Sequence, residues 1–183
     1  IKDISGLNYR LAGEVIGAAD EAVPMILKGG GIKNTLIISP PGAGKTTMLR
    51  DIVRQLSYKS YRVSVVDERN EIAALCEGRS AFDLGFSTDV LEGVDKAEGM
   101  LMVLRSMSPD VIVTDEIGKQ SDIDAIERIT NSGAAVIATI HGRNIDMIKR
   151  RDDLKRMLKF FDLIITLSKR NGIGTVEEAL TEW

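Results

Sequence analysis

Two short segments of the chain place glycine, lysine, hydroxyl and carboxylate groups where they could bind phosphate and transfer it. The first is Ser39-Pro40-Pro41-Gly42-Ala43-Gly44-Lys45-Thr46-Thr47, between an apolar run and a helical pattern. Small residues let backbone N–H groups close around a phosphate, and the following helix directs its positive end at the same anion. This context is typical of a P-loop. It predicts nucleotide-binding residues Pro41, Gly42, Ala43, Gly44, Lys45, Thr46 and Thr47.

Two side chains of this segment have predicted roles of their own. Lys45 is expected to reach the β- and γ-phosphates, and the Thr46 hydroxyl to bind Mg²⁺. The strict P-loop pattern begins with glycine, whereas this chain has Ser39, which fits if its φ is negative. The alternative is a turn before a helix that binds no ligand.

The second segment, Val111-Ile112-Val113-Thr114-Asp115-Glu116, is an apolar run that ends in two carboxylates. Asp115 is predicted to hold a water molecule of the Mg²⁺ shell, and Glu116 to polarise the attacking water as general base. The alternative is a helix cap with a neighbouring solvated acid. A P-loop strand, an intervening strand and an Asp-Glu strand follow the order of the additional-strand, catalytic-glutamate class of P-loop ATPases.

Two further strand ends carry polar groups. Glu68 could assist the metal or the water, or form a salt bridge to Arg69 or Arg105. His141, the only histidine, is expected within reach of the γ-phosphate, or it is structural. Arg105 could hold the loop at 67–71 or reach the nucleotide of a neighbouring subunit.

Strands and helices alternate along most of the chain, which predicts an α/β fold with a mostly parallel sheet and helices on both faces. The segment 70–95 is expected to carry loops. The predicted strands are Thr35–Ser39, Arg62–Asp67, Asp110–Asp115, Ala134–Ile140, Asp162–Ser168 and a returning strand Gly174–Leu180. The predicted helices are Lys45–Ser57, Lys96–Met107, Ser121–Ser132 with Ser121 as cap and Gly133 as stop, and about Asn144–Lys159.

The first 31 residues read as a lead-in to the P-loop domain at 32–183. A strand is expected at Ile4–Leu11. A helix with one buried face should follow and end at Gly29-Gly30-Gly31. The apolar positions of this helix are Val15, Ile16, Ala19, Val23, Ile26 and Leu27.

Composition narrows the class of protein. The 183 residues have a formal charge of −3, a pI of about 5.3 and 4 % aromatic residues, which disfavours a nucleic-acid partner. The single cysteine, Cys76, allows no internal disulfide and suits a reducing cytosol. The apolar runs are too short to cross a bilayer.

Because the chain begins without methionine, it is expected to be a piece of a longer protein. Basic residues within 147–159 predict a solvated helix face, or contact with a partner or lipid.

Five segments together resemble the stage III sporulation protein AA family. They are 38–51, 66–73, 96–118, 138–143 and 170–178, and the resemblance extends over essentially the whole chain. It implies a cytosolic, magnesium-dependent ATPase related to the hexameric ATPases of type II and type IV secretion. In those relatives, 66–71 corresponds to an aspartate box and 139–141 to a histidine box. Glu68, Arg105 and His141 take supporting catalytic roles on this basis.

The resemblance also implies a homo-oligomeric ring, a hexamer in the full-length form, that energises a membrane channel. The protein would be peripheral to the membrane, on the mother-cell side. Relatives often have Ile-Arg-Asp after the catalytic glutamate, where this chain has Ile117-Gly118-Lys119, and they carry an amino-terminal domain. The chain alone is therefore expected to be monomeric and slow. Two other functions stay open: a nucleic-acid-dependent ATPase of the RecA-like type, and an assembly subunit gated by nucleotide with little hydrolysis.

Overall fold

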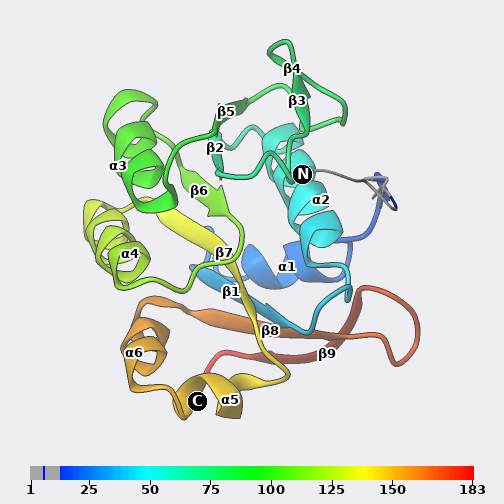
Figure 1. Ribbon diagram of the computed structural model, residues 1–183, viewed down its shortest axis with the longest axis vertical. Helices are drawn as coiled ribbons and strands as arrows, with labels where there is room; N and C mark the ends of the chain where they lie inside the picture. Colours follow the sequence, from blue (N-terminus) through cyan, green and yellow to red (C-terminus); the bar gives the residue numbers. More distant parts are fainter. Residues whose placement is uncertain (1–5, 7–12) are drawn as a thin grey trace.

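A seven-stranded sheet forms the centre of the computed structural model, which describes residues 6 and 13–183. The strand order is β5-β2-β6-β7-β1-β8-β9, and every pairing in this sheet is parallel except that of β8 with β9 (Figure 1). A separate hairpin, β3 with β4, projects above it. The strands are β1 Thr35–Ser39, β2 Val63–Asp67, β3 Leu75–Cys76, β4 Arg79–Ser80, β5 Thr88–Glu92, β6 Val111–Thr114, β7 Ala135–His141, β8 Leu163–Ser168 and β9 Thr175–Leu180.

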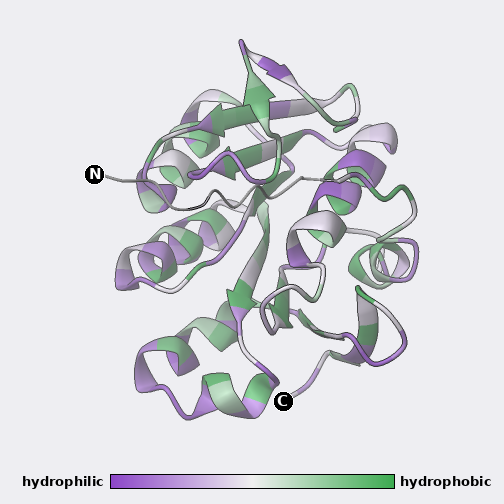
Figure 2. Ribbon diagram, turned by 45° about the vertical axis from the view of Figure 1, so that its right-hand side comes forward, coloured by the Kyte–Doolittle hydropathy of each residue, from purple (hydrophilic) through white to green (hydrophobic). Residues whose placement is uncertain are grey.

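Helices cover both faces of this sheet. Successive residues of a strand point to opposite faces, so Leu36 and Ile38 of β1 enter one apolar core and Ile37 enters the other. In Figure 2 the central strands are mostly apolar, and the helices that flank them carry hydrophilic residues as well. The helices are α1 Ala22–Ile26, α2 Lys45–Tyr58, α3 Lys96–Ser106, α4 Gln120–Ser132, α5 Ile145–Lys149, α6 Asp152–Lys155 and the 3-10 helix η1 Arg156–Phe160.

The two cores divide the helices between the faces. α1 and α2 pack on one face of the sheet, and α3, α4, α5, α6 and η1 on the other. Because β1, β2, β6 and β7 are parallel, their carboxyl ends meet at one edge, where Ser39 lies level with His141. The predicted fold class is confirmed. The polar strand ends therefore share one edge of the sheet.

Several predicted boundaries are wrong. The helix expected over 144–159 is three short pieces, and Arg151 between α5 and α6 is extended. A continuous helix would have placed Asp152 on the face that buries Ile148. The break instead lets Leu154 and Met157 reach the core. Within 70–95, predicted as loops, Thr88–Glu92 forms the edge strand β5 beside β2.

The prediction of Ser121 as the cap of α4 is also wrong. Ser121 lies inside the helix, and the side chain of Asp122 accepts the N–H groups of Gly118 and Lys119, at 2.9 Å each. Gly133 does end this helix, with φ of 89°.

The lead-in differs from the prediction as well. Its helix is only Ala22–Ile26, and Val15 and Ile16 are exposed because residues 16–21 form turns. The strand predicted at Ile4–Leu11 lies outside the described residues, and a domain boundary at residue 31 stays a prediction.

Candidate functional site

The P-loop joins the buried end of β1 to the first turn of α2. Two glycines take the left-handed conformation that the loop needs, with φ of 69° at Gly42 and 92° at Gly44. Ser39 keeps the extended backbone of β1, so glycine is not required at the first position of the motif. A cavity of about 270 Å³ opens beside the loop. Its lining comes from Pro41, Gly42, Gly44, Lys45, Thr46, Thr47, Glu71, Glu116 and His141.

Six of the seven predicted binding residues line this cavity, and Ala43 does not. Ala43 is fully buried, and its carbonyl accepts a hydrogen bond from Gly174 at 3.1 Å. Its contribution to binding would be its backbone N–H, which donates to the carbonyl of Pro40 at 3.3 Å.

Glu116 occupies a strained backbone position at the end of β6. Its φ is 45°, which is uncommon for a residue with a side chain and marks candidate functional positions. Its N–H donates to Oγ1 of Thr139 at 2.9 Å, and its carbonyl accepts from Nζ of Lys96 at 3.1 Å. Contacts from β7 and from α3 thus hold the Glu116 backbone in a conformation that turns its carboxylate toward the cavity.

Three basic side chains surround the Glu116 carboxylate. Nε2 of His141 lies 2.7 Å from Oε1, Nη1 of Arg69 lies 3.0 Å from Oε2, and Nζ of Lys45 lies 3.7 Å from Oε1. Nζ of Lys45 also lies 3.1 Å from Nδ1 of His141. An imidazole that carries its proton on Nε2 satisfies both contacts, because Nε2 then donates to Glu116 and Nδ1 accepts from Lys45.

The charges at the site shift the pKa values of these groups. Burial raises the pKa of Glu116, but His141, Lys45 and Arg69 outweigh it and hold the pKa below its ordinary value. Burial lowers the pKa of Lys45, although Glu116 and Asp115 oppose that shift. Glu116 is therefore ionised at neutral pH and can accept a hydrogen bond from water.

Asp115 is buried, with 3 % of its surface exposed. Burial raises its pKa to about 6, and the carboxylates of Asp67, Glu71 and Glu116 add to this rise while Lys96 opposes it. Nζ of Lys96 lies 3.9 Å from Oδ1 of Asp115. Such a concentration of negative charge favours a bound cation.

A loop after β2 brings a further carboxylate to the site. Asp67 is fully buried, and its two oxygens accept the N–H groups of Glu71, Ile72 and Ala73 at 2.8, 2.9 and 2.8 Å. The guanidinium of Arg50 donates to the carbonyls of Glu71 and Ile72 at 2.9 and 2.8 Å. The loop is thereby fixed, with Glu71 on the cavity wall.

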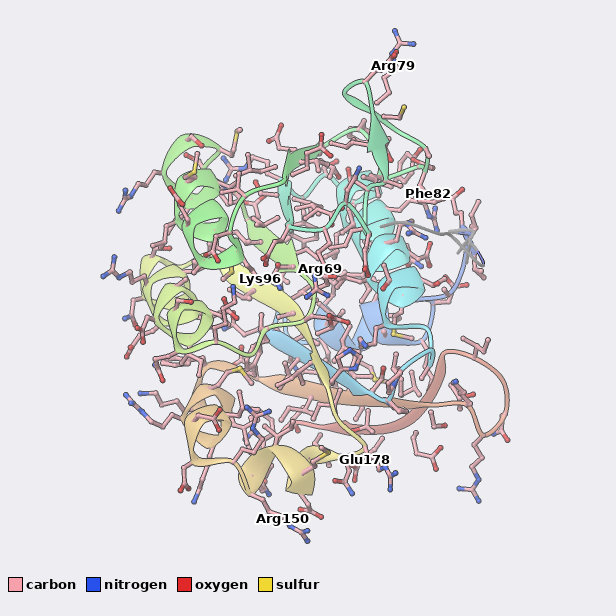
Figure 3. The ribbon with its side chains drawn as sticks, in the orientation of Figure 1. Arg69, Arg79, Phe82, Lys96, Arg150 and Glu178 are labelled. Carbon is pink, nitrogen blue, oxygen red and sulfur yellow. The ribbon has the colours of Figure 1, made fainter. Side chains whose placement is uncertain are left out.

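The predicted site residues Glu68 and Arg105 do not line the cavity. Glu68 pairs with Lys96, at 3.7 Å, and not with Arg69 or Arg105. Lys96 thus links Glu68 to Asp115, and in Figure 3 it lies near Arg69, which also contacts Glu116. Arg105 does not join the site. It is exposed in the last turn of α3, roughly 14 Å along the helix from Lys96.

The residues that line the cavity or contact Glu116 without having been predicted to do so are Arg69, Glu71, Lys96 and Thr139. Each lies in a segment that was interpreted from the sequence, but the residue type alone does not indicate a role at the site. Arg69 and Glu71 depend on the shape of the loop after β2. From the sequence alone, Lys96 cannot be distinguished from any other lysine in the first turn of a helix.

Among the described residues, no group of three or more histidine, cysteine, aspartate or glutamate side chains is arranged to hold a metal ion. The same part of the chain contains no helix with the length and apolar character needed to span a bilayer.

A model of the family described as "Sporulation stage III, protein AA" matches residues 1–182. The chain belongs to this family. Its relatives include stage III sporulation protein AA of Bacillus subtilis (strain 168), 39 % identical over 97 % of this chain and 60 % of that protein. The protein SEEDLING PLASTID DEVELOPMENT 1 of Arabidopsis thaliana is 31 % identical over 85 % of this chain and 22 % of that protein. The chain therefore spans less than two thirds of the length of either of these two relatives.

Solved structures with the same fold are P-loop ATPases. The ATPase DotB of Legionella pneumophila is 20 % identical with a TM-score of 0.56, over 73 % of this chain and 40 % of that one. The VirB11 ATPase of the Brucella suis type IV secretion system is 15 % identical with a TM-score of 0.61, over 88 % and 50 %. The pilus retraction motor PilT with bound ADP is 20 % identical with a TM-score of 0.59, over 80 % and 45 %. The family member described here thus has the predicted P-loop fold.

Proposed function

We propose that this chain is a magnesium-dependent ATPase domain, which binds ATP in the cavity beside the P-loop and hydrolyses it. The observation that carries the proposal is the placement of Lys45 and Glu116. Both line one cavity of about 270 Å³, at the amino end of the 14-residue helix α2. The helix end and the lysine suit the phosphates, and the carboxylate suits the water that attacks them.

The chain's own groups can carry out the reaction as follows. Backbone N–H groups of the P-loop and the Lys45 ammonium bind the phosphates, and Lys45 leaves its contacts with Glu116 and His141 to do so. Glu116 accepts a hydrogen bond from a water molecule and takes its proton as the water oxygen bonds to the γ-phosphorus. The bond from that phosphorus to the β–γ bridging oxygen breaks, which yields ADP and inorganic phosphate. His141 would donate a hydrogen bond to the γ-phosphate or keep Glu116 oriented.

The residues present fit a magnesium ion. Mg²⁺ is usually held by one or two carboxylates together with substrate phosphates, so a dedicated group of three protein ligands is not needed. Thr46 lines the cavity, and burial together with the nearby carboxylates raises the pKa of Asp115 to about 6, so a cation beside it would offset the surrounding negative charge. When bound, Mg²⁺ would neutralise charge that develops on the phosphate oxygens. Thr46 would hold it directly and Asp115 through water.

The wider role follows from the relatives. VirB11 belongs to a type IV secretion system, PilT is a pilus retraction motor, and the Bacillus subtilis relative is a sporulation protein. Together with the family resemblance, they lead us to propose a cytoplasmic ring, a hexamer in the longer protein, that acts at the inner face of a membrane on channel proteins of a sporulation complex. In such a ring the exposed Arg105 would contact a neighbouring subunit's nucleotide.

One observation favours a second function, an assembly subunit that binds ATP with little hydrolysis. The Glu116 carboxylate is held by His141, Arg69 and Lys45, and its contacts with these groups lower its pKa and therefore its basicity. The two functions differ in the rate of phosphate release.

Two substitutions test the proposal. Lys45→Ala should abolish ATP binding measured by calorimetry, whereas Lys59→Ala, at the other end of α2, should leave it unchanged. Glu116→Gln should keep ATP binding but lower phosphate release by about 10²–10⁴-fold. Glu178→Gln, on the exposed strand β9, is the matched control (Figure 3). Full ATP affinity in Lys45→Ala would refute the site, and unchanged phosphate release in Glu116→Gln would refute the assignment of the base.

A further inference from the structure

The loop between β8 and β9, residues 169–174, lies directly against the P-loop. The backbone N–H of Gly174 donates to the carbonyl of Ala43 at 3.1 Å. A Cβ atom on Gly44 would lie 3.0 Å from Cγ2 of Ile173 and 3.2 Å from Cα of Gly174. Glycine at position 44 therefore provides positive φ and also room for this loop.

The same loop brings a cation to the other P-loop glycine. A Cβ atom on Gly42 would lie 3.0 Å from Nζ of Lys169, which is the first residue after β8. No carboxylate in the described part of the chain forms an ion pair with Lys169. Its ammonium therefore lies over the P-loop without a compensating negative charge.

Internal contacts fix the shape of the loop. Oγ1 of Thr175 donates to the carbonyl of Gly172 at 2.8 Å. The carboxylate of Glu177 accepts from Arg170 at 3.0 Å and from Oγ of Ser168 at 2.8 Å. Glycines at 172 and 174 supply φ values of 120° and 88°. The backbone of the loop that carries Lys169 and Ile173 is thus held before any ligand arrives.

The strand order places this loop on the opposite side of the P-loop from the catalytic groups. In the order β6-β7-β1-β8, Glu116 and His141 follow β6 and β7 on one side of β1, and Lys169 follows β8 on the other. A triphosphate whose γ-phosphate faces Glu116 must extend its nucleoside toward the β8 side. Ile173, with 74 % of its surface exposed, is the large apolar side chain at that place.

We propose that the loop 169–174 is the nucleoside-binding part of the site, for a nucleoside di- or triphosphate. Ile173 contacts the base, the aliphatic stem of Lys169 lies beside the ribose, and its ammonium lies near the phosphates. Exposed apolar surface next to a phosphate-binding loop is stabilised when a base covers it. This inference rests on the proposed function, because it needs a nucleotide at the P-loop.

The test compares ADP with inorganic tripolyphosphate, each bound with Mg²⁺ by the 183-residue chain. Ile173→Ser should weaken ADP binding about tenfold, or 1.4 kcal/mol, and leave the affinity for tripolyphosphate, measured by displacement of ADP, unchanged. Ile173→Met keeps the apolar surface and should restore ADP affinity to within about twofold. Met107→Ser, an exposed methionine at the far end of α3, is the control and should change neither affinity.

The outcomes separate this inference from the function on which it rests. Unchanged ADP affinity in Ile173→Ser overturns the inference, and so does equal weakening of ADP and tripolyphosphate, because the loop would then act only through the shape of the P-loop. Failure of Ile173→Met to restore ADP binding also overturns the apolar contact. By contrast, full ADP affinity in Lys45→Ala would overturn the proposed function itself.

Discussion

Replacing Asp67 by asparagine should loosen the loop that carries Glu71 to the cavity. The buried carboxylate accepts three backbone N–H groups, one on Oδ1 and two on Oδ2, at 2.8–2.9 Å. Asparagine retains a single oxygen. In its best orientation this oxygen keeps the pair from Ile72 and Ala73, and the new NH₂ group then faces the N–H of Glu71.

The magnitude follows from that geometry. The substitution exchanges a charged acceptor for a neutral one at two bonds, loses the third bond and leaves a buried donor without a partner. A hydrogen bond to a charged group contributes about 1.5–3 kcal/mol and an unpaired buried group costs about 1–3 kcal/mol, so we expect a loss of about 3 kcal/mol. For a domain of this size the melting temperature should fall by roughly 6–12 °C.

Urea denaturation followed by circular dichroism measures this loss as a change in midpoint at constant slope. Asp89→Asn is the matched control, because Asp89 is exposed on β5 and should change the free energy of unfolding by less than about 0.5 kcal/mol. If Asp67→Asn cost less than about 1 kcal/mol, or no more than the control, the carboxylate would not be what holds the loop.

Two other predictions concern stability away from the cavity. Burial raises the pKa of Asp51, but hydrogen bonds from the backbone, Gln55 and Arg54 outweigh it, and the pKa lies below its ordinary value of 3.8. The ionised Asp51 therefore stabilises the fold above about pH 4, and this stabilisation is lost as pH falls through the folded-state pKa. The difference in free energy of unfolding between the wild type and Asp51→Asn should consequently shrink in acid. A difference in urea midpoints that does not change with pH would contradict this. Gly85→Ala should cost about 2–4 kcal/mol, because φ is 77° and the new Cβ would lie 2.5 Å from Cβ of Ser57. Gly78→Ala, with φ of 75° and open space around it, should cost only the backbone part, about 1–2 kcal/mol; equal losses in the two variants would exclude the steric contribution.

The sequence was most informative where one physical requirement dominates. A strand buried on both faces must be apolar along its length, so β1 was predicted with its observed ends. The P-loop and the Asp115-Glu116 pair were also found from sequence, because phosphate and metal binding constrain residue type and spacing together.

Prediction from the sequence failed where contacts between distant segments determine the local structure. The helix expected over 144–159 breaks at Arg151, which keeps Asp152 off the face that buries Ile148 and lets Leu154 reach the core; these contacts are not visible in the local pattern. Glu71 lies on the cavity wall in a loop that Asp67 and Arg50 hold through backbone contacts, and no local pattern predicts these contacts. The approach of Ile173 to Gly44 depends on the pairing of β8 with β9, and no local pattern encodes it.

The backbone of Glu116 is attached to two elements that lie on different layers. Thr139 fixes its N–H from the sheet, and Lys96 fixes its carbonyl from the helical layer above. A rigid displacement of α3 relative to β7 would therefore rotate the peptide units on either side of this residue and carry its carboxylate with them. Under the proposed function, such a displacement of α3 would also move the water molecule that Glu116 is expected to hold.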